Sequence, residues 1–409
     1  MTITTLVNPV LSSGPEGMQF NPAQLAYSER PGFCCKILDV GLGFDNNSFT
    51  FSQYNRYTGA YLDDQAKADI LGSIPRSGVN LRLAGAGRAA EFGYQTFAAN
   101  IQTTCRAEVD IPRDVFELLL SGNKLDRQYS ARGARAEAEV LFRSGVGAGT
   151  AVGRDFALGM AVHYLRGLFR AELTECEVQF LTTNEKLFTN GRVGYRMATG
   201  GSGISFDAGV AWWSDRPEDP NDRWWKGWWL SLACLDISPG ILWTDGTEQG
   251  VLCFRLDSAN AYEISRGERF SHREELVAGE PFKTMVPMRV NLGLGSRLKE
   301  WLNNALLVQP VLDVSPFALR EFRCGVLSEL WLREWLPIGC EVAYQKGRGA
   351  VIGVDGALIM GKLTFVLGMS DVTGLFLAAK GAELRLSIAY GAFNERKKKE
   401  RPFYMHASE

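Results

Sequence analysis

The side chains that could carry chemistry are few in this chain. Its 409 residues include 3 histidines and 8 cysteines, and no two cysteines form a Cys-x-x-C pair. Histidine is the commonest general base and metal ligand, so its scarcity argues against a histidine-based catalytic or metal centre. Gly-x-Ser-x-Gly and His-Glu-x-x-His motifs are also absent. We therefore expect a protein that is not an enzyme and that holds no metal and no cofactor.

One glycine-rich stretch imitates a nucleotide site. Residues 85–90 read Gly-Ala-Gly-Arg-Ala-Ala, like the start of a dinucleotide fingerprint. That fingerprint must open a helix, whereas residues 91–97 alternate between polar and apolar side chains like a strand. We therefore interpret residues 85–90 as a tight turn.

The elements that position the other side chains are β-strands. Alternation with a period of two, typical of half-buried strands, recurs from about residue 79 to the end of the chain. In residues 156–164, large apolar side chains alternate with Ala, Gly and His. The same pattern predicts strands over 78–87, 106–111, 135–142, 191–198, 204–213, 228–237, 288–294, 337–344, 350–359, 361–369 and 383–390.

Two architectures could bury one face of so many strands. A soluble sandwich or propeller would place the apolar face inside, and a transmembrane barrel would place it against lipid. The barrel is favoured because the polar faces mix both charge signs with Gly and Ala, and because strands of about 9–11 residues can cross a bilayer. Tryptophans also flank a polar turn, as at a membrane interface, although they could instead stack on a sugar. They are Trp212, Trp213, Trp224, Trp225, Trp228 and Trp229.

Two short helices are expected to interrupt the strands. One covers residues 64–72 after a capping Asp63, and the other covers 112–121 before Gly122. The charged region 257–284 is interpreted as a solvent loop, and the charge run 395–401 as part of a solvated tail.

Charge and hydropathy exclude other classes of protein. The net charge of -2 gives no basic surface for nucleic acid. No apolar run approaches the ~18 residues of a transmembrane helix. Residues 1–20 lack the basic and then apolar pattern of a signal peptide. Most cysteines stand singly in apolar alternating stretches, so we interpret them as small apolar side chains.

Several short motifs occur in an order that resembles a known family. Asn21-Pro22-Ala23 is similar to the Asn-Pro-Ala segment of the long-chain fatty-acid transporter superfamily. With residues 46–48, 118–123, 158–167, 203–210 and 384–393, the pattern resembles an uncharacterised Bacteroidetes outer-membrane β-barrel family, a domain of unknown function related to that superfamily. The resemblance implies a single closed antiparallel transmembrane barrel of about 14 strands, in a range of about 12 to 16.

The resemblance also implies a division of the chain and a polar lumen. Residues 1–30 would form an N-terminal plug or hatch with the motif Asn21, Pro22 and Ala23; residues 31–394 would form the barrel and 395–409 a basic polar tail. The residues expected to line the lumen are Arg82, Arg106, Glu108, Arg135, Glu137, Glu139, His163, Asp207, Arg289, Glu341, Asp355, Glu383 and Arg385. They could form an ion-pair network that stiffens the barrel, or a lining that selects what passes.

The leading functional hypothesis is an outer-membrane transporter or channel for small, apolar molecules, gated by the hatch. Its partners would be membrane lipid and a small-molecule substrate, and not nucleic acid. One alternative is a non-transporting accessory or scaffold barrel for a secretion or envelope complex, with the tail and region 257–284 as partner surfaces. Another is a soluble all-β carbohydrate-binding protein. A lumenal Ser/His/Asp hydrolase using His163 and Asp207 is a further alternative, although a structural pair is expected.

Overall fold

A computed structural model describes most of the chain. The described residues are 15–26, 33–153, 155–184, 186–214, 227–259, 270–299, 302–314, 317–333, 335–369, 372 and 380–392. The expectations for residues 1–14 and 27–30 of the hatch, for Trp224 and Trp225, and for the tail 395–409 lie outside these residues. In the described part, no helix has the length and apolar character needed to span a membrane.

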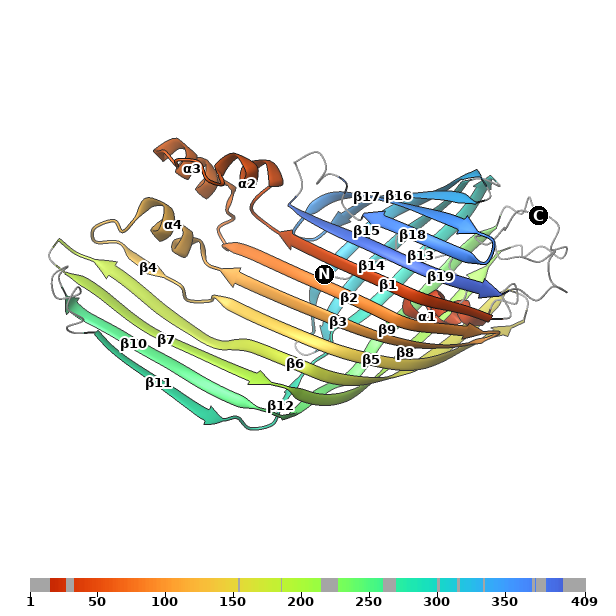
Figure 1. The fold of residues 1–409 in the computed structure, drawn as a ribbon, viewed down its shortest axis with the longest axis horizontal. Coiled ribbons are helices and arrows are strands. Elements are labelled where there is room, and N and C mark those ends of the chain that lie inside the picture. Colours follow the sequence, from red (N-terminus) through yellow and green to blue (C-terminus); the bar gives the residue numbers. More distant parts are fainter. Residues whose placement is uncertain are drawn as a thin grey trace.

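The described strands form one closed antiparallel barrel (Figure 1). The first strand, β1 (Phe33–Asn46), pairs with both β2 (Val79–Tyr94) and the last strand, β19 (Gly381–Ala392), which closes the ring. Four barrel strands are each interrupted: β4 continues into β5, β7 into β8, β9 into β10, and β11 through β12 into β13. Counted in this way the barrel has 14 strands, as predicted.

The other strand segments have the following bounds: β3 (Phe97–Ile111), β4 (Gln128–Ser130), β5 (Arg135–Val152), β6 (Phe156–Thr182), β7 (Leu187–Ala198), β8 (Gly200–Trp213), β9 (Trp228–Asp245), β10 (Glu248–Ala259), β11 (Phe270–Ala278), β12 (Phe282–Thr284), β13 (Met288–Lys299), β14 (Leu302–Val314), β15 (Phe317–Arg333), β16 (Leu336–Gln345), β17 (Gly349–Met360) and β18 (Leu363–Met369).

The apolar face of the strands points outward. Met160 of β6 is 68% exposed, whereas its neighbour Ala161 is 5% exposed. On β19, Leu384 is 56% exposed and Arg385 is 4% exposed. A soluble sandwich would bury the apolar face and expose the charged one. The soluble carbohydrate-binding alternative is therefore wrong, and the alternation is that of a barrel in lipid.

The two ends of the barrel differ (Figure 1). At one end, named here the terminal end, β1 begins and β19 ends. At the other, the helical end, lie α2 (Phe51–Tyr57), α3 (Asp64–Ser73) and α4 (Arg113–Ser121).

Local capping explains the three helices of the helical end. The carboxylate of Asp63 accepts a hydrogen bond from the backbone of the first turn of α3, and α4 ends at Gly122 with φ of 72°. Both predicted helices are confirmed to within a residue. The third helix, α2, was not predicted, although Thr50 and Gln53 form a capping box at its start.

The barrel strands are unequal in length. β6 has 27 residues, and its second half pairs with β7, which pairs in turn with β10 and then β11. These segments form a sheet that projects past the other strands at the helical end (Figure 1), named here the wing. The predicted loop 257–284 is wrong for residues 270–278 and 282–284, which form β11 and β12. Residues 273–278 of β11 are all exposed, so neither face of this strand is buried. Its sequence therefore lacks the alternation of apolar and polar residues that would predict a strand.

Residues 85–90 are not the predicted turn, because they lie inside β2 in register with β3. A Cβ atom at Gly85 would lie 2.5 Å from the Sγ atom of Cys105 on β3. The glycines therefore permit close packing along the strand and do not reverse the chain. Because small residues lie on both faces of this stretch, its sequence shows no clear alternation of large apolar and polar side chains.

Residues 15–26 lie inside the barrel at the terminal end. They form α1 (Pro15–Phe20) and a 3-10 helix, η1 (Pro22–Ala26), and η1 contacts β5, β6 and β8. All five residues of η1 are buried.

Candidate functional site in the lumen

Asn21 fixes the N-terminal segment to the barrel wall. The residue is fully buried, and its side-chain amide donates to the Ser231 hydroxyl at 2.7 Å and the Val210 carbonyl at 2.9 Å. Its Oδ1 atom accepts from the Ala23 N–H at 2.9 Å, which shapes the start of η1. Asn291 of β13 donates to the last carbonyl of α1 at 2.8 Å. Side-chain hydrogen bonds thus hold the segment against β8, β9 and β13.

Inward-facing glycines let this segment lie directly on the wall. A Cβ atom at Gly159 would lie 2.1 Å from the carbonyl carbon of Pro22, and one at Gly209 would lie 2.0 Å from Oδ1 of Asn21. Two glycines of β5 lie equally close: a Cβ at Gly147 would lie 2.6 Å from Met18, and one at Gly149 would lie 2.5 Å from the backbone of Ala26. A side chain at Gly149 or Gly159 would displace the backbone of the segment, and one at Gly147 or Gly209 would force the side chain of Met18 or Asn21 to move.

Apolar contacts complete this end of the lumen. Phe20 packs with Leu307 of β14 and Leu327 of β15, and Met18 packs near Ala161 of β6. All of these side chains are buried. Each large one contributes about 1.5–3 kcal/mol through burial. Apolar and small side chains therefore pack directly against residues 15–26.

An ion cluster lies on the wall formed by β5, β6, β8 and β9. Asp207 accepts from Nε2 of His163 at 2.7 Å, from Arg143 at 2.9 Å and from the backbone N–H of Asp236 at 2.7 Å. Asp236 has φ of 61° and pairs with Arg143 and Arg289. Because both oxygens of Asp207 are engaged in this packing, the arrangement is that of a structural ion network.

A second buried cluster crosses the seam between the first and last strands. Asp39 of β1 contacts Arg88 of β2 at 2.7 Å and Arg385 of β19 at 2.6 Å. Lys36 lies 3.3 Å from Asp39 and 3.2 Å from Glu91 of β2. The cluster therefore ties together the three strands that close the barrel.

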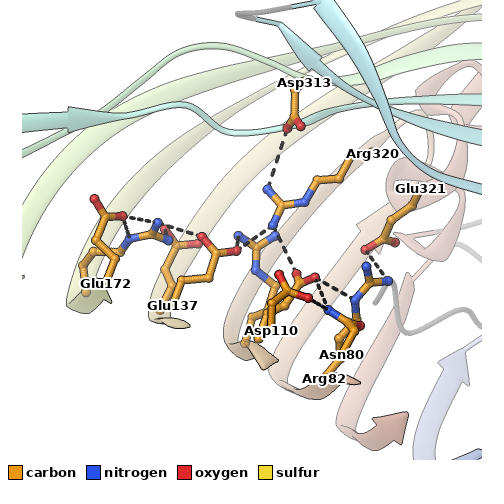
Figure 2. Close-up of polar contacts among 12 residues, drawn as sticks. Asn80, Arg82, Asp110, Glu137, Glu172, Asp313, Arg320 and Glu321 are labelled. Carbon is orange, nitrogen blue, oxygen red and sulfur yellow. Dashed lines mark hydrogen bonds and ion pairs between the residues drawn. The ribbon is translucent and has the colours of Figure 1, made fainter. Parts of the chain in front are cut away.

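A network of ion pairs spans the lumen at the helical end (Figure 2). Arg320 of β15 contacts Glu137 of β5 at 2.6 Å and Glu108 of β3 at 3.5 Å. β15 lies seven strands from β3 around the ring of 14, so these pairs cross from wall to wall. Arg82 of β2 pairs with Glu108 at 2.9 Å and reaches Glu321 of β15 at 3.9 Å.

The network continues along the inner wall from Glu137. Arg106 lies 3.2 Å from Glu137, and Arg170 of β6 contacts Glu137 at 2.9 Å and Glu172 at 2.5 Å. Arg196 of β7 pairs with the same Glu172. Arg106, Glu137, Glu172 and Arg196 are half-buried and so lie close to water, whereas Arg170 between them is buried.

Two cavities open between these side chains. The smaller, of about 420 Å³, is lined by Asn80, Arg82, Arg135 and Arg348, among others. The larger, of about 800 Å³, is lined by Glu137, Glu172, Arg196 and Arg320, among others. Glu108 and Asp110 line both. The helical half of the lumen is thus polar and contains both cavities, whereas residues 15–26 occupy the terminal half.

The residues expected to line the lumen lie on the inner wall, in separate groups. Arg82, Arg106, Glu108, Arg135, Glu137 and Glu139 lie at the helical end; His163, Asp207 and Arg289 lie in the central cluster; and Glu341, Asp355, Glu383 and Arg385 lie on β16, β17 and β19. Trp212, Trp213, Trp228 and Trp229 lie at the terminal end of β8 and β9, and Trp228 is 54% exposed. Their roles remain predictions.

Sequence reasoning missed several residues of these networks. The missed residues include Lys36, Asp39, Arg88, Glu91, Arg143, Arg170, Glu172, Arg196, Asp236, Arg320, Glu321 and Arg323. Arg143 has the same parity as the predicted Glu139, so a longer alternating window would have included it. Asp236 and Arg320 lie at strand irregularities, where alternation gives no signal.

Within the described ranges, no group of three or more His, Cys, Asp or Glu side chains is arranged to hold a metal ion. The eight cysteines, all described, are free thiols.

Comparison with known proteins agrees with the geometry. Residues 36–224 match a family described as a family of unknown function, DUF5723. The sequence has no match among curated proteins. The solved structures that are similar in fold include the following two.

One of these structures is a Pseudomonas aeruginosa FadL homologue, with a TM-score of 0.51 and 11% identity over 94% of this chain and 95% of that one. The other is a deltaS2S3 mutant of the TodX monoaromatic hydrocarbon channel, with a TM-score of 0.51 and 9% identity over 94% and 96% of the two chains. At such identities the similarity shows the fold alone. The predicted resemblance to a family of unknown function is confirmed for residues 36–224, and the chain forms a 14-strand barrel of the same fold as these two structures.

Proposed function

We propose that this chain is an outer-membrane channel or transporter for small apolar molecules, in which residues 15–26 act as a hatch. The observation that carries the proposal is the packing of these residues on the four inward-facing glycines. The hatch is held by side-chain hydrogen bonds and apolar contacts, which a modest displacement can break without unfolding a strand.

Two further observations support the choice of substrate and location. The TodX channel, which shares this fold, is described as a monoaromatic hydrocarbon channel. In this chain the lumen beside the hatch is lined by Leu307, Leu327 and small side chains, which suit an apolar solute. The outward apolar faces of the strands suit a lipid surround.

The substitution Gly159→Ala tests the hatch in the full chain. Its Cβ atom would overlap the backbone of Pro22, so η1 must leave the wall. We expect higher conductance in planar bilayers and faster uptake of toluene into vesicles than for the unsubstituted protein. Gly356→Ala is the matched control, because Gly356 is also a strand glycine and nothing lies within 4 Å of its Cβ position.

Asn21→Ala provides an independent test, because it removes the bonds to Ser231 and Val210 without adding bulk. We expect a smaller rise in conductance than for Gly159→Ala. Equal conductance in Gly159→Ala, Asn21→Ala and Gly356→Ala would contradict a hatch in this position.

The wing favours a second candidate function, an accessory barrel that holds an envelope partner. Among the described strands, β11 pairs only with β10, so one of its edges is open to pairing. Replacing Glu274 by Pro on this strand would block such pairing. If the variant lost an envelope partner in cross-linking experiments while toluene uptake stayed normal, the accessory function would be supported over transport.

A further inference from the structure

We infer that Arg320 determines the selectivity of the lumen: its ion pairs across the helical end form a charge screen, in series with the hatch, that favours small cations over anions. The inference rests on the proposed channel function and adds to it a second barrier of opposite chemistry. The hatch is held by hydrogen bonds and apolar contacts, whereas this screen is made of ion pairs.

Arg320 reaches the lumen because of a β-bulge. In the pairing of β14 with β15, Val311 faces Glu321 and Leu312 faces Leu319, so Arg320 is left between two pairs. A bulge turns a side chain away from the regular alternation. Arg320 and Glu321 are adjacent in sequence and both reach ionic partners across the lumen (Figure 2). An ordinary strand would have pointed one of them to the outer face.

The contacts of Arg320 join three parts of the wall. Its guanidinium lies 2.6 Å from Glu137, 3.5 Å from Glu108 and 3.7 Å from Asp313 of the neighbouring β14. Its side chain is 22% exposed, so it is within reach of solutes in the cavity. A planar guanidinium can hold several carboxylates at once, which a lysine ammonium does less rigidly.

Arg320 lines the larger of the two cavities and not the smaller. The charged residues that line the larger cavity are Glu108, Asp110, Glu137, Glu172, Glu175 and Asp313 against Arg135, Arg196 and Arg320. Carboxylates therefore outnumber guanidinium groups on the lining of this cavity, and a ring of carboxylates favours cations. The guanidinium of Arg320 neutralises part of this negative charge and occupies space at the edge of the cavity.

A cysteine reporter below the screen tests the inference. Gln309 lies on β14 between Leu307, which packs on Phe20 of the hatch, and Asp313, which pairs with Arg320. In Gln309→Cys, a thiol reagent that enters through the larger cavity at the helical end passes Arg320. We would measure the reaction rates of cationic and anionic methanethiosulfonates of similar size. Labelling of the eight native cysteines, measured with Gln309 in place, is subtracted.

We expect Gln309→Cys to react faster with the cationic reagent than with the anionic one. Adding Arg320→Gln should raise the cationic rate and the ratio of cationic to anionic rates. Adding Arg320→Lys should raise both rates but preserve their ratio, because it keeps the charge and loses the planar fork. Arg166→Gln is the matched control, since Arg166 pairs with Asp245 at a 42% exposed site and should change neither rate.

Two results would overturn the inference: an unchanged rate ratio in Arg320→Gln, or no labelling at Gln309→Cys even in that variant. The conductance of Gly159→Ala tests the proposed hatch independently of the charge screen. If Gly159→Ala left conductance unchanged while Arg320→Gln changed the labelling ratio, the screen would stand and the hatch would not.

Discussion

Asp39 shows how a single residue can organise charge inside this barrel. It is 1% exposed, and Lys36, Arg88 and Arg385 all lie within 3.3 Å of its carboxylate. Buried charges are costly unless they are paired. The carboxylate therefore makes it possible for three cations to be buried where the first and last strands meet.

The substitution Asp39→Asn is expected to lower the free energy of unfolding by about 3–5 kcal/mol, because it leaves buried cations with too few partners. Urea unfolding in vesicles measures the change. Asp245→Asn is the control: Asp245 is 58% exposed in its pair with Arg166, so its loss should cost only about 0–1 kcal/mol. Equal losses of unfolding free energy in Asp39→Asn and Asp245→Asn would contradict a larger contribution from the buried cluster around Asp39 than from an exposed ion pair.

At the scale of elements, irregularities decide where functional side chains point. The bulge in β15 brings Arg320 into the lumen, and irregular pairing between β8 and β9 accompanies the left-handed conformation of Asp236. Both residues join ion pairs that regular strands would not have formed. Bulges are frequent beside functional sites for this reason.

The docking of α4 at the helical end should depend on pH. Hydrogen bonds from Lys124 at 2.9 Å and from Arg127 at 2.5 Å lower the pKa of Glu117 below its ordinary value of about 4.3. Its stabilisation is therefore complete above that ordinary pKa and is lost as the pH falls through the lowered one. We expect hydrogen exchange in residues 113–121, corrected for intrinsic rates, to speed up in acid.

Glu117→Gln should abolish this acid-dependent step and leave α4 less protected at neutral pH. The control Glu274→Gln, in the exposed wing, should keep the step as it is in the unsubstituted protein. If hydrogen exchange in Glu117→Gln still accelerated in acid to the same extent, that acceleration would come from the protonation of other carboxylates.

At the scale of the whole molecule, the barrel has an apolar outer belt and a wing beyond it. Met160 on the belt and Val277 on the wing are similarly exposed, at 68% and 63%. If the belt is in lipid, Met160→Arg should destabilise the folded barrel in vesicles by about 2–4 kcal/mol. Val277→Arg stays in water and should change stability by less than about 0.5 kcal/mol. Equal effects in urea unfolding would contradict the membrane placement.

The sequence by itself determined most of the strands and their outward faces. Alternation at 156–164 and 383–390 predicted the exposure of Met160 and Leu384, because side-chain direction in a strand follows directly from residue parity. Helix caps at Asp63 and Gly122 were equally local signals. Where a strand lay in water on both faces, as in β11, parity carried no signal and the strand was missed.

Only the tertiary structure decided which inward residues meet. Asn21 and Ser231 are 210 residues apart in sequence, and Arg320 and Glu137 are 183 apart, yet each pair is in contact. Strand parity fixes whether a side chain points into the lumen or toward the outer face. It cannot fix which side chain faces it across the lumen, because that depends on closure of the ring and on the bulge that turns Arg320 inward.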